Sequence, residues 1–289
     1  MPLKRRTGLI HTGIQTKSFM HQKGGNILEQ KKKEKAVVYR QTQRATGIYD
    51  MWIETSLACQ ARPGQFISVY TQNQSALLPR PISVCETDKE KGRLRIVYRV
   101  AGTGTREFAT YKSGHRIDIL GMLGNGFPVE TAKGKRAFLI GGGIGIPPML
   151  ELAKTLTDAA SKEIIVGYRD KELFLTDDLK KYGNVHIATE DGSVGTKGTV
   201  LTAIETENLS ADVVFACGPM PMLRAIKQYA QKKGIPAYIS LEERMACGVG
   251  ACLGCVVKTK EVNHHSHVNN ARICTDGPVY LASEVNLEN

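Results

Sequence analysis

The sequence predicts a β plus α/β protein with an antiparallel β-barrel, a doubly wound parallel sheet and a small cysteine-rich module. Short β-type runs broken by Gly and Pro fill residues 35–131. Apolar strands alternate with helical stretches over residues 132–238, and four cysteines lie close together in residues 239–289. The chain has 289 residues, enough for two domains and a small module, since domains contain about 100 to 200 residues. Its 42% hydrophobic and 23% charged residues disfavour wholesale disorder and a coiled coil.

Residues 1–34 are predicted to be a basic, disordered leader. Residues 1–35 contain nine of the 39 Lys and Arg residues and two of the 28 acidic ones, so most of the net charge of +11 lies there. This distribution argues against a basic nucleic-acid-binding surface on the folded part. The leader loosely resembles an organellar transit peptide. Alternatively, it is translated ribosome-binding sequence, with Lys23-Gly24-Gly25 encoded by that sequence and the native chain starting at Leu28.

Residues 35–131 are predicted to form the barrel, because short strands at close spacing are typical of small antiparallel barrels. The β-type runs are Val37–Tyr39, Met51–Ile53, Gln65–Tyr70, Ile82–Val84 and Leu94–Val100. Two polar segments lie among them. The first is Arg80-Pro81-Ile82-Ser83, which combines a guanidinium, a rigid turn and a hydroxyl. The second is Gly102-Thr103-Gly104-Thr105, which combines two glycines with two hydroxyls. Each segment is ordinary alone.

A glycine-rich turn opens the α/β part. The apolar run Ala137–Ile140 predicts a buried strand, and a helix is expected from Pro147 or Pro148 through Met149–Leu156. Between them lies Gly141-Gly142-Gly143-Ile144-Gly145-Ile146. A helix N-terminus beside glycines can hold a pyrophosphate. The turn is not the G-x-G-x-x-G fingerprint, however, and any tight turn also requires glycine, so both interpretations stay open here.

The rest of this part continues the strand and helix alternation. Strands are expected at Glu163–Gly167, Val185–Thr189 and Asp212–Cys217, and helices at Leu175–Tyr182, Val200–Glu207 and Met220–Gly234. Such alternation predicts a parallel, doubly wound sheet. Ligands bind beyond the carboxyl ends of such strands, where Glu190 and Cys217-Gly218-Pro219 should face one crevice. The most apolar stretch, residues 137–150, is shorter than the 18 or so residues of a membrane span, so none is predicted.

Four cysteines carry the clearest chemical signal. Seven cysteines without a secretion signal argue against a disulfide framework. The pattern Cys247-x4-Cys252-x2-Cys255-x18-Cys274 is typical of plant-type [2Fe-2S] ligation. Small residues let the backbone approach the cluster sulfurs, and here they are Gly248, Val249, Gly250, Ala251 and Gly254. The alternatives are structural zinc, which usually needs two C-x2-C knuckles, and buried inert thiols. The nearby His264, His265 and His267 are expected in a solvated loop, with metal ligation as the alternative.

The order of these segments resembles the ferredoxin-NADP reductase superfamily. The matching features are Arg-Pro-x-Ser, a Gly-Thr turn, Gly-Gly-x-Gly-x-x-Pro and Cys-Gly-Pro, which together span Lys35 to about Pro236. With Glu242-Glu243-Arg244-Met245-Ala246-Cys247 and the cysteine module behind them, everything after the leader resembles the electron-transfer subunits of NAD-dependent dihydroorotate dehydrogenases. The resemblance implies one FAD and one [2Fe-2S] cluster per chain, with NAD as co-substrate.

The resemblance also implies where the cofactors bind. FAD is expected at Arg80, Pro81, Ile82, Ser83, Val97, Tyr98, Arg99, Gly104 and Thr105. In that interpretation an Arg pairs with the pyrophosphate, hydroxyls donate to the flavin and a Tyr stacks on its ring. Without the family, Tyr98 and Arg99 equally indicate a strand with one packed and one exposed side chain.

NAD is expected at Gly141, Gly142, Gly143, Gly145, Pro147, Glu190, Cys217, Gly218 and Pro219. No catalytic residue is assigned. Cys217 is expected to position the nicotinamide and not to act as a nucleophile, because no activating His or Lys stands beside it in sequence. Glu190 either orients nicotinamide or ribose or is a surface carboxylate. NAD is favoured over NADP because Glu190 and Asp191 would repel a 2′-phosphate, although Arg169 would attract one.

The cofactor set predicts an electron-transfer subunit in the cytoplasm. No residue looks like a general acid or base for dihydroorotate oxidation, so that chemistry is expected on an FMN-containing partner, in a heterotetramer of two plus two subunits in pyrimidine (UMP) biosynthesis. The expected path is dihydroorotate, partner FMN, [2Fe-2S], FAD and NAD. Related alternatives serve a sulfide dehydrogenase, a ferredoxin:NADP oxidoreductase or a hydrogenase. A nucleic-acid-binding protein with a four-cysteine zinc module is the alternative from another class.

Overall fold

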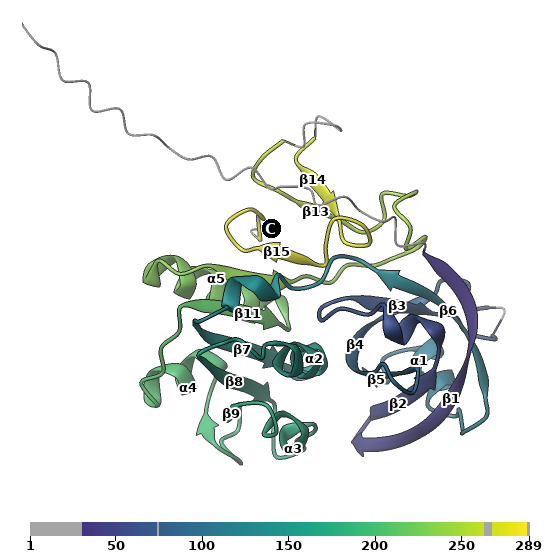
Figure 1. The fold of residues 1–289 in the computed structure, drawn as a ribbon, viewed down its shortest axis with the longest axis horizontal. Helices are drawn as coiled ribbons and strands as arrows, with labels where there is room; N and C mark the ends of the chain where they lie inside the picture. Colours follow the sequence, from purple (N-terminus) through teal and green to yellow (C-terminus); the bar gives the residue numbers. More distant parts are fainter. Residues whose placement is uncertain (1–30, 74, 263–267, 288–289) are drawn as a thin grey trace, which may run out of the picture. The chain divides into compact units, whose positions relative to one another are not determined.

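Six antiparallel strands close a barrel in the order β1-β2-β5-β4-β3-β6 (Figure 1). The computed structural model describes residues 31–73, 75–262 and 268–287. The barrel strands are β1 (Lys32–Ala45), β2 (Ile48–Glu54), β3 (Phe66–Val69), β4 (Arg80–Asp88), β5 (Arg93–Arg99) and β6 (Arg116–Leu123). Short helical segments lie between or after them at η1 (Ser56–Cys59), α1 (Thr103–Phe108) and η2 (Val129–Ala132). The predicted barrel is confirmed.

Strand β1 begins earlier than the sequence indicated. Lys32, Lys33 and Glu34 were assigned to the leader, yet they pair with Gly121, Leu120 and Ile119 of β6. The Glu34 carboxylate accepts hydrogen bonds from the backbone N–H of Ser56 at 3.0 Å and from its hydroxyl at 2.6 Å. Burial acts to raise the pKa of Glu34, but the side chains of Lys32, Ser56 and Thr55 lower it to about 2. Long-range pairing thus recruits the end of a basic stretch into the barrel. The transit-peptide and Leu28-start hypotheses concern residues outside the described ones.

A seven-stranded sheet follows, in the order β10-β9-β8-β7-β11-β12-β15. Its strands are β7 (Arg136–Gly142), β8 (Ser161–Tyr168), β9 (Asn184–Thr189), β10 (Thr196–Lys197), β11 (Val213–Cys217), β12 (Ala237–Ser240) and β15 (Val279–Leu281). All neighbouring pairs are parallel except β12 with β15, which is antiparallel. The predicted parallel sheet is confirmed. Strand β15 comes from the region assigned to the cysteine module, so the end of that module completes the edge of this sheet.

Helices cover both faces of the sheet, as the doubly wound prediction requires. Side chains alternate along β7, so that Phe138 and Ile140 pack on one face and Ala137 and Leu139 on the other. The first face is covered by α4 (Val200–Thr206) and α5 (Met220–Lys233), and the second by α2 (Pro147–Thr155) and α3 (Thr176–Leu179). Helix α3 is shorter than the predicted Leu175–Tyr182: it begins one residue later, because Leu175 takes a left-handed conformation with φ 65°, and it ends three residues earlier, at Leu179.

The cysteine module contributes one small sheet of its own, formed by β13 (Val256–Lys258) and β14 (Asn270–Arg272). A 3-10 turn, η3 (Gly143–Gly145), joins β7 to α2. His264, His265 and His267 lie outside the described residues. None of the helices described in this structure is long and apolar enough to cross a membrane.

Helix α2 lies between the sheet and the barrel (Figure 1), and its buried Glu151 joins the two. The Glu151 carboxylate is 4% exposed and accepts hydrogen bonds from the Thr87 backbone N–H at 2.8 Å and hydroxyl at 2.7 Å. Nearby, the buried Arg95 guanidinium bridges Asp50 of the barrel at 2.7 Å and Asp178 of α3 at 3.0 Å. These polar contacts therefore connect the barrel to the helices of the parallel sheet.

Replacing Glu151 with alanine should destabilise the chain by about 2 to 4 kcal/mol, because two buried donors on Thr87 lose their acceptor. The matched control is Glu172→Ala, since Glu172 accepts the same two kinds of hydrogen bond from Thr46 at an exposed position. That control should cost under about 1 kcal/mol. Urea unfolding of both variants measures the difference. Equal losses would contradict the role of Glu151.

Candidate functional site

The barrel opens between β4 and β5, at the end where the predicted flavin segments lie. Pairing of β4 with β5 extends from Val84 opposite Ile96 to Asp88 opposite Arg93. Beyond that point Arg80–Ser83 pair with β3, whereas Val97–Arg99 pair with β2. The two strands therefore diverge, and their backbone groups become free to meet a ligand. Ile82 packs into the barrel core, while Pro81 and Ser83 are half-buried on the outer face.

Arg80 and Gly104 form a close contact at this opening. A Cβ built on Gly104 would lie 2.6 Å from Arg80 Nε, so only glycine lets the guanidinium lie against this turn. The Arg80 guanidinium also donates to the Leu78 carbonyl. The Thr105 hydroxyl stabilises its own turn, because it accepts a hydrogen bond from the backbone N–H of Ala101 at 2.9 Å. A half-buried guanidinium beside a glycine turn fits a pyrophosphate group.

The predicted stacking of Tyr98 on a flavin ring is not supported. Tyr98 is 2% exposed and packs inside the barrel, stacked on Tyr49 at 5.9 Å between ring centroids. Its hydroxyl donates to Gln41 Oε1 at 2.8 Å, and burial raises its pKa. Arg99 is exposed, so the alternative of one packed and one exposed side chain describes this strand. Segment 97–99 can meet a flavin only through its backbone and Arg99.

The predicted nucleotide segments come together at the carboxyl ends of β7 and β11. Gly141 pairs with Cys217 across these strands. A Cβ built on Gly145 would lie 2.3 Å from the Cys217 carbonyl oxygen and 2.6 Å from Gly218 Cα. Pro147 begins α2, whose N-terminus follows the turn. The two turns thus form one backbone surface at the helix N-terminus, which suits a pyrophosphate.

Cys217 and Glu190 differ in their surroundings. Burial raises the pKa of the Cys217 thiol to about 12, although a hydrogen bond with Ser240 acts to lower it. The thiol therefore stays neutral, in line with the predicted positioning role and against a nucleophilic one. Glu190 is exposed at the end of β9, two strands away from β7 in the sheet. No contact among the described residues joins Glu190 to the glycine turn.

Replacing Gly145 with alanine should weaken NADH binding and destabilise the chain. The added methyl would overlap backbone atoms of Cys217 and Gly218, which cannot rotate away as a side chain could. Overpacking of this kind costs about 1 to 3 kcal/mol, or roughly a tenfold or greater loss of affinity. Stopped-flow NADH binding and thermal unfolding measure the two effects. Wild-type values for both would show that the turns can separate freely.

The four predicted ligands form two pairs of thiols. Cys247 Sγ and Cys252 Sγ are 3.3 Å apart, and Cys255 and Cys274 are both buried and close enough to influence each other's charge. Within the described part of the chain, no three Cys, His, Asp or Glu side chains surround one point as they would for a single metal ion. Two pairs suit a two-iron cluster, because four thiolates share two irons.

The loop around Cys247 stabilises the thiolate form of this cysteine. Gly248 and Gly250 have φ of 69° and 84°, a left-handed conformation that favours glycine. The N–H groups of Val249 and Cys252 donate to Cys247 Sγ at 3.5 and 3.4 Å. Burial acts to raise the pKa of Cys247, but these hydrogen bonds lower it to about 6. The donor set therefore fits a [2Fe-2S] cluster, the group that the cysteine spacing predicts.

The three sites are linked by contacts that the sequence did not indicate. A Cβ built on Gly248 would lie 3.5 Å from Ser68 Oγ, and Ser68 pairs with Pro81 of the predicted flavin segment. On the other side, a Cβ built on Gly143 would lie 3.3 Å from Arg99 Nη2. Ser68 is not part of a recognisable sequence motif, and the approach of Arg99 to the glycine turn joins residues far apart in the chain. No sequence signal could therefore have predicted either feature.

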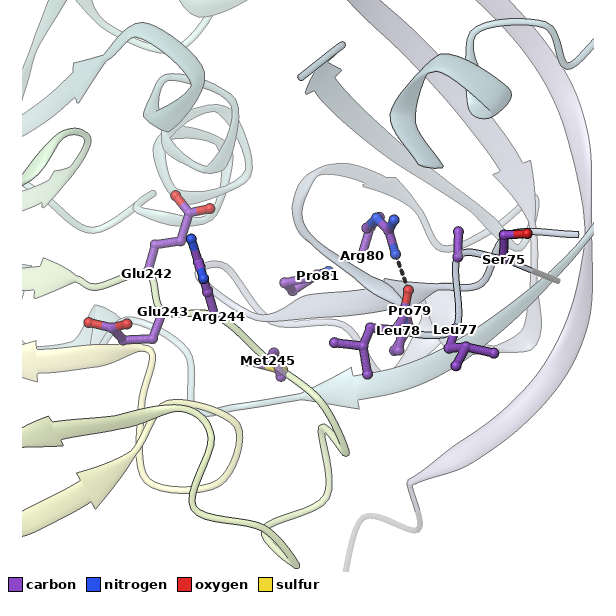
Figure 2. A pocket seen from close by; sticks show the side chains of 11 residues that line it. Ser75, Leu77, Leu78, Pro79, Arg80, Pro81, Glu242, Glu243, Arg244 and Met245 are labelled. Carbon is purple, nitrogen blue, oxygen red and sulfur yellow. Dashed lines mark hydrogen bonds between the residues drawn. The ribbon is translucent and has the colours of Figure 1, made fainter. Parts of the chain in front are cut away.

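A groove of about 780 Å³ lies between the barrel and the segment that leads to Cys247. Figure 2 shows residues 75–81 on one side, with the Arg80 to Leu78 hydrogen bond, and residues 242–245 on the other. Leu77 and Leu78 are exposed beside it. The groove borders Arg80 and leads toward the cysteine loop, so it adjoins both the predicted flavin site and the predicted cluster site.

Comparisons with known proteins agree with this geometry. Residues 242–286 match the model of the iron–sulfur cluster binding domain of dihydroorotate dehydrogenase B. The chain is 42% identical over 260 residues to the dihydroorotate dehydrogenase B (NAD(+)) electron transfer subunit of Bacillus cereus strain G9842, covering 88% of this chain and 98% of that one. The corresponding subunit of Bacillus caldolyticus is 43% identical over 258 residues, with the same coverage.

A solved structure extends the likeness to three dimensions. The structure of an NADH-dependent reduced ferredoxin-NADP oxidoreductase superposes with a TM-score of 0.77 at 28% identity, covering 87% of this chain and 90% of that one. The resemblance predicted from the motifs is therefore confirmed over the barrel, the parallel sheet and the cysteine module. The chain belongs to the family of electron-transfer subunits of dihydroorotate dehydrogenase B (NAD(+)).

Proposed function

We propose that this chain passes electrons from an FMN-containing dihydroorotate dehydrogenase catalytic subunit, through [2Fe-2S] and FAD, to NAD+ in pyrimidine (UMP) biosynthesis. One observation carries the proposal. Ser68 lies close to Gly248 of the cysteine loop and pairs with Pro81 of one predicted flavin segment, and Arg99 of the other predicted flavin segment lies close to Gly143 of the glycine turn. This arrangement lines up three predicted sites in the order that an electron path needs. The names of the similar proteins support the choice of partner and acceptor.

Bound FAD would supply the exchange between hydride transfer with nicotinamide and single-electron transfer with iron–sulfur. The chain's own residues bind and orient. Arg80 would pair with the flavin pyrophosphate beside Gly104, and Ser83, on the outer face of β4 with Pro81, would present its hydroxyl to the ring. On the other side, the glycine turn and the N-terminus of α2 would hold the pyrophosphate of NAD. Neutral Cys217 would position the nicotinamide.

Dihydroorotate oxidation itself would belong to the partner subunit, in a heterotetramer of two plus two chains. The exposed acids Glu190 and Asp191 at the end of β9 support NAD over NADP, because they would repel a 2′-phosphate. Arg169, also exposed, is the residue that would act against this preference. The cytoplasmic location stays a prediction, supported by the free state of all seven cysteines.

The decisive experiment is anaerobic spectroscopy followed by reconstitution with the catalytic subunit. The purified chain should contain about two irons and one FAD, and NADH should bleach both. With an FMN-containing dihydroorotate dehydrogenase subunit, dihydroorotate should then reduce NAD+. A colourless, flavin-free chain that binds zinc after reconstitution would refute the proposal.

A second candidate is a subunit of an NADH-dependent ferredoxin:NADP oxidoreductase, favoured by the TM-score of 0.77 to such a protein. The same preparation separates the two functions. Copurification with an FMN-containing subunit and turnover with dihydroorotate favour the first. Reduction by ferredoxin without any response to dihydroorotate favours the second.

A further inference from the structure

Ser68 lies on β3 where the barrel meets the cysteine loop. Its backbone pairs with Pro81 of β4 and with Leu120 of β6. Its neighbours Ile67 and Val69 belong to the barrel core. Since side chains alternate along a strand, Ser68 projects from the outer face. Gly248 lies over this face, and a Cβ built on its backbone would be 3.5 Å from Ser68 Oγ.

The Ser68 hydroxyl is a buried hydrogen-bonding group without a partner. The residue is 0% exposed, and its Oγ makes no hydrogen bond with any residue that the structure describes. A Cβ built on Gly248 would also lie 3.4 Å from Leu123 and 3.7 Å from Leu120. They are hydrocarbon and accept no hydrogen bond. A buried hydroxyl without a partner destabilises a protein, so this position calls for an acceptor that the polypeptide does not supply.

The cluster that the neighbouring cysteine loop is predicted to hold would offer such an acceptor. Gly248 directly follows Cys247, one of the four predicted ligands. The sulfur atoms of a [2Fe-2S] cluster are negatively charged and accept hydrogen bonds, and such bonds help to set its reduction potential. We propose that Ser68 Oγ donates a hydrogen bond to a cluster sulfur and thereby raises the reduction potential of the cluster.

The inference rests on the proposed function, because it requires the cluster to be bound. Reduction adds one electron and therefore negative charge to the cluster, while the serine keeps its proton. The donor stabilises the reduced state more than the oxidised state, so removing it lowers the potential. Ser68 is thus a positioning residue at the junction between Pro81 of the flavin segment and the cluster loop. Its charge-assisted hydrogen bond should change the reduction equilibrium about tenfold.

The test is a redox titration of the full chain with both cofactors bound, followed by electron paramagnetic resonance of the reduced cluster. In Ser68→Ala the midpoint should fall by about 59 mV, which is a tenfold change for one electron. Ser68→Thr keeps the hydroxyl and should restore most of the difference. The control is Ser210→Ala, a hydroxyl bonded to Arg136 at the amino end of the sheet, and it should leave the midpoint unchanged.

Two further readouts separate this role from a structural one. Deuterium exchange with electron–nuclear double resonance should show, besides the couplings of backbone N–H groups such as those of Val249 and Cys252, an exchangeable proton coupled to the wild-type cluster that is absent in Ser68→Ala. Without the cluster, Ser68→Ala should be at least as stable to urea as the wild type, because the hydroxyl then has no partner to lose. A less stable cluster-free variant would reveal a protein partner and overturn the inference.

The inference also fails if Ser68→Ala keeps its iron and FAD with an unchanged cluster midpoint and proton coupling. It fails as well if only the flavin midpoint moves, since the hydroxyl would then serve the flavin. Iron and sulfide analysis of the wild type comes first. Absence of a [2Fe-2S] cluster there would refute the proposed function itself, whereas a loaded wild type with an unresponsive variant refutes only the role of Ser68.

Discussion

Cys274→Ser is expected to remove the iron–sulfur cluster and to leave the flavin in place. Cys274 is fully buried and belongs to the same core as Leu123, and burial and the neighbouring Cys255 raise the pKa of its thiol. Loss of an outer-shell partner already lowers metal affinity about 10- to 100-fold, so loss of a ligand should cost more. Iron content should fall close to zero, and dihydroorotate-dependent NAD+ reduction should fall with it.

Flavin content and the flavin reaction show whether this variant is otherwise correctly folded. Because the predicted flavin segments lie in the barrel, FAD content and NADH-dependent dye reduction should stay near wild type. Cys59→Ser is the matched control, since Cys59 is an exposed thiol whose Sγ lies 3.6 Å from the Lys89 carbonyl oxygen. It should keep all its iron. Full iron in Cys274→Ser would show that the ligand set is wrong.

Arg80→Ala is expected to strip FAD from the chain. The Arg80 guanidinium lies against Gly104 at the point where β4 and β5 diverge, and it is the half-buried cation of the predicted flavin segment. Removing one partner of a buried charge pair costs about 2 to 5 kcal/mol, which is about 30-fold or more in FAD affinity. Extracted flavin per chain and fluorescence titration of FAD into the deflavinated protein measure the loss.

Two further variants sharpen this result. Arg80→Lys should recover only part of the affinity, because an ammonium is a point charge that cannot bind a pyrophosphate bidentately. Arg93→Ala removes a guanidinium from the opposite end of β5, where it pairs with Glu54 at 3.1 Å, and should keep FAD. If Arg80→Ala retained one FAD with wild-type affinity, another group would have to hold the pyrophosphate.

Local pattern was sufficient to predict the main architecture. The apolar run before Gly141, the prolines at the start of α2 and the strand at 213–217 all appear where periodicity and turn residues indicate them. The cysteine spacing likewise predicts a ligand set, which the structure arranges as two pairs of thiols. These features depend on residues that are close in the chain, so the sequence alone suffices to predict them.

Long-range pairing decided the rest. By composition, Lys32–Glu34 look like the end of a basic leader. They nevertheless form the start of β1, because the backbone of β6 pairs with them. Tyr98 points into the barrel and Arg99 away from it, since the register with β2 determines which face each side chain takes. Strand β15 joins the nucleotide sheet through its pairing with β12.

The sequence by itself thus determined the barrel, the doubly wound sheet, the glycine turn and the four cysteines. Only the tertiary structure decided how these parts lie next to one another, with Gly248 close to Ser68 and Gly143 close to Arg99. The physical reason is that a motif records what a segment can bind, whereas the approach of two segments depends on strand register and packing between residues far apart in the chain.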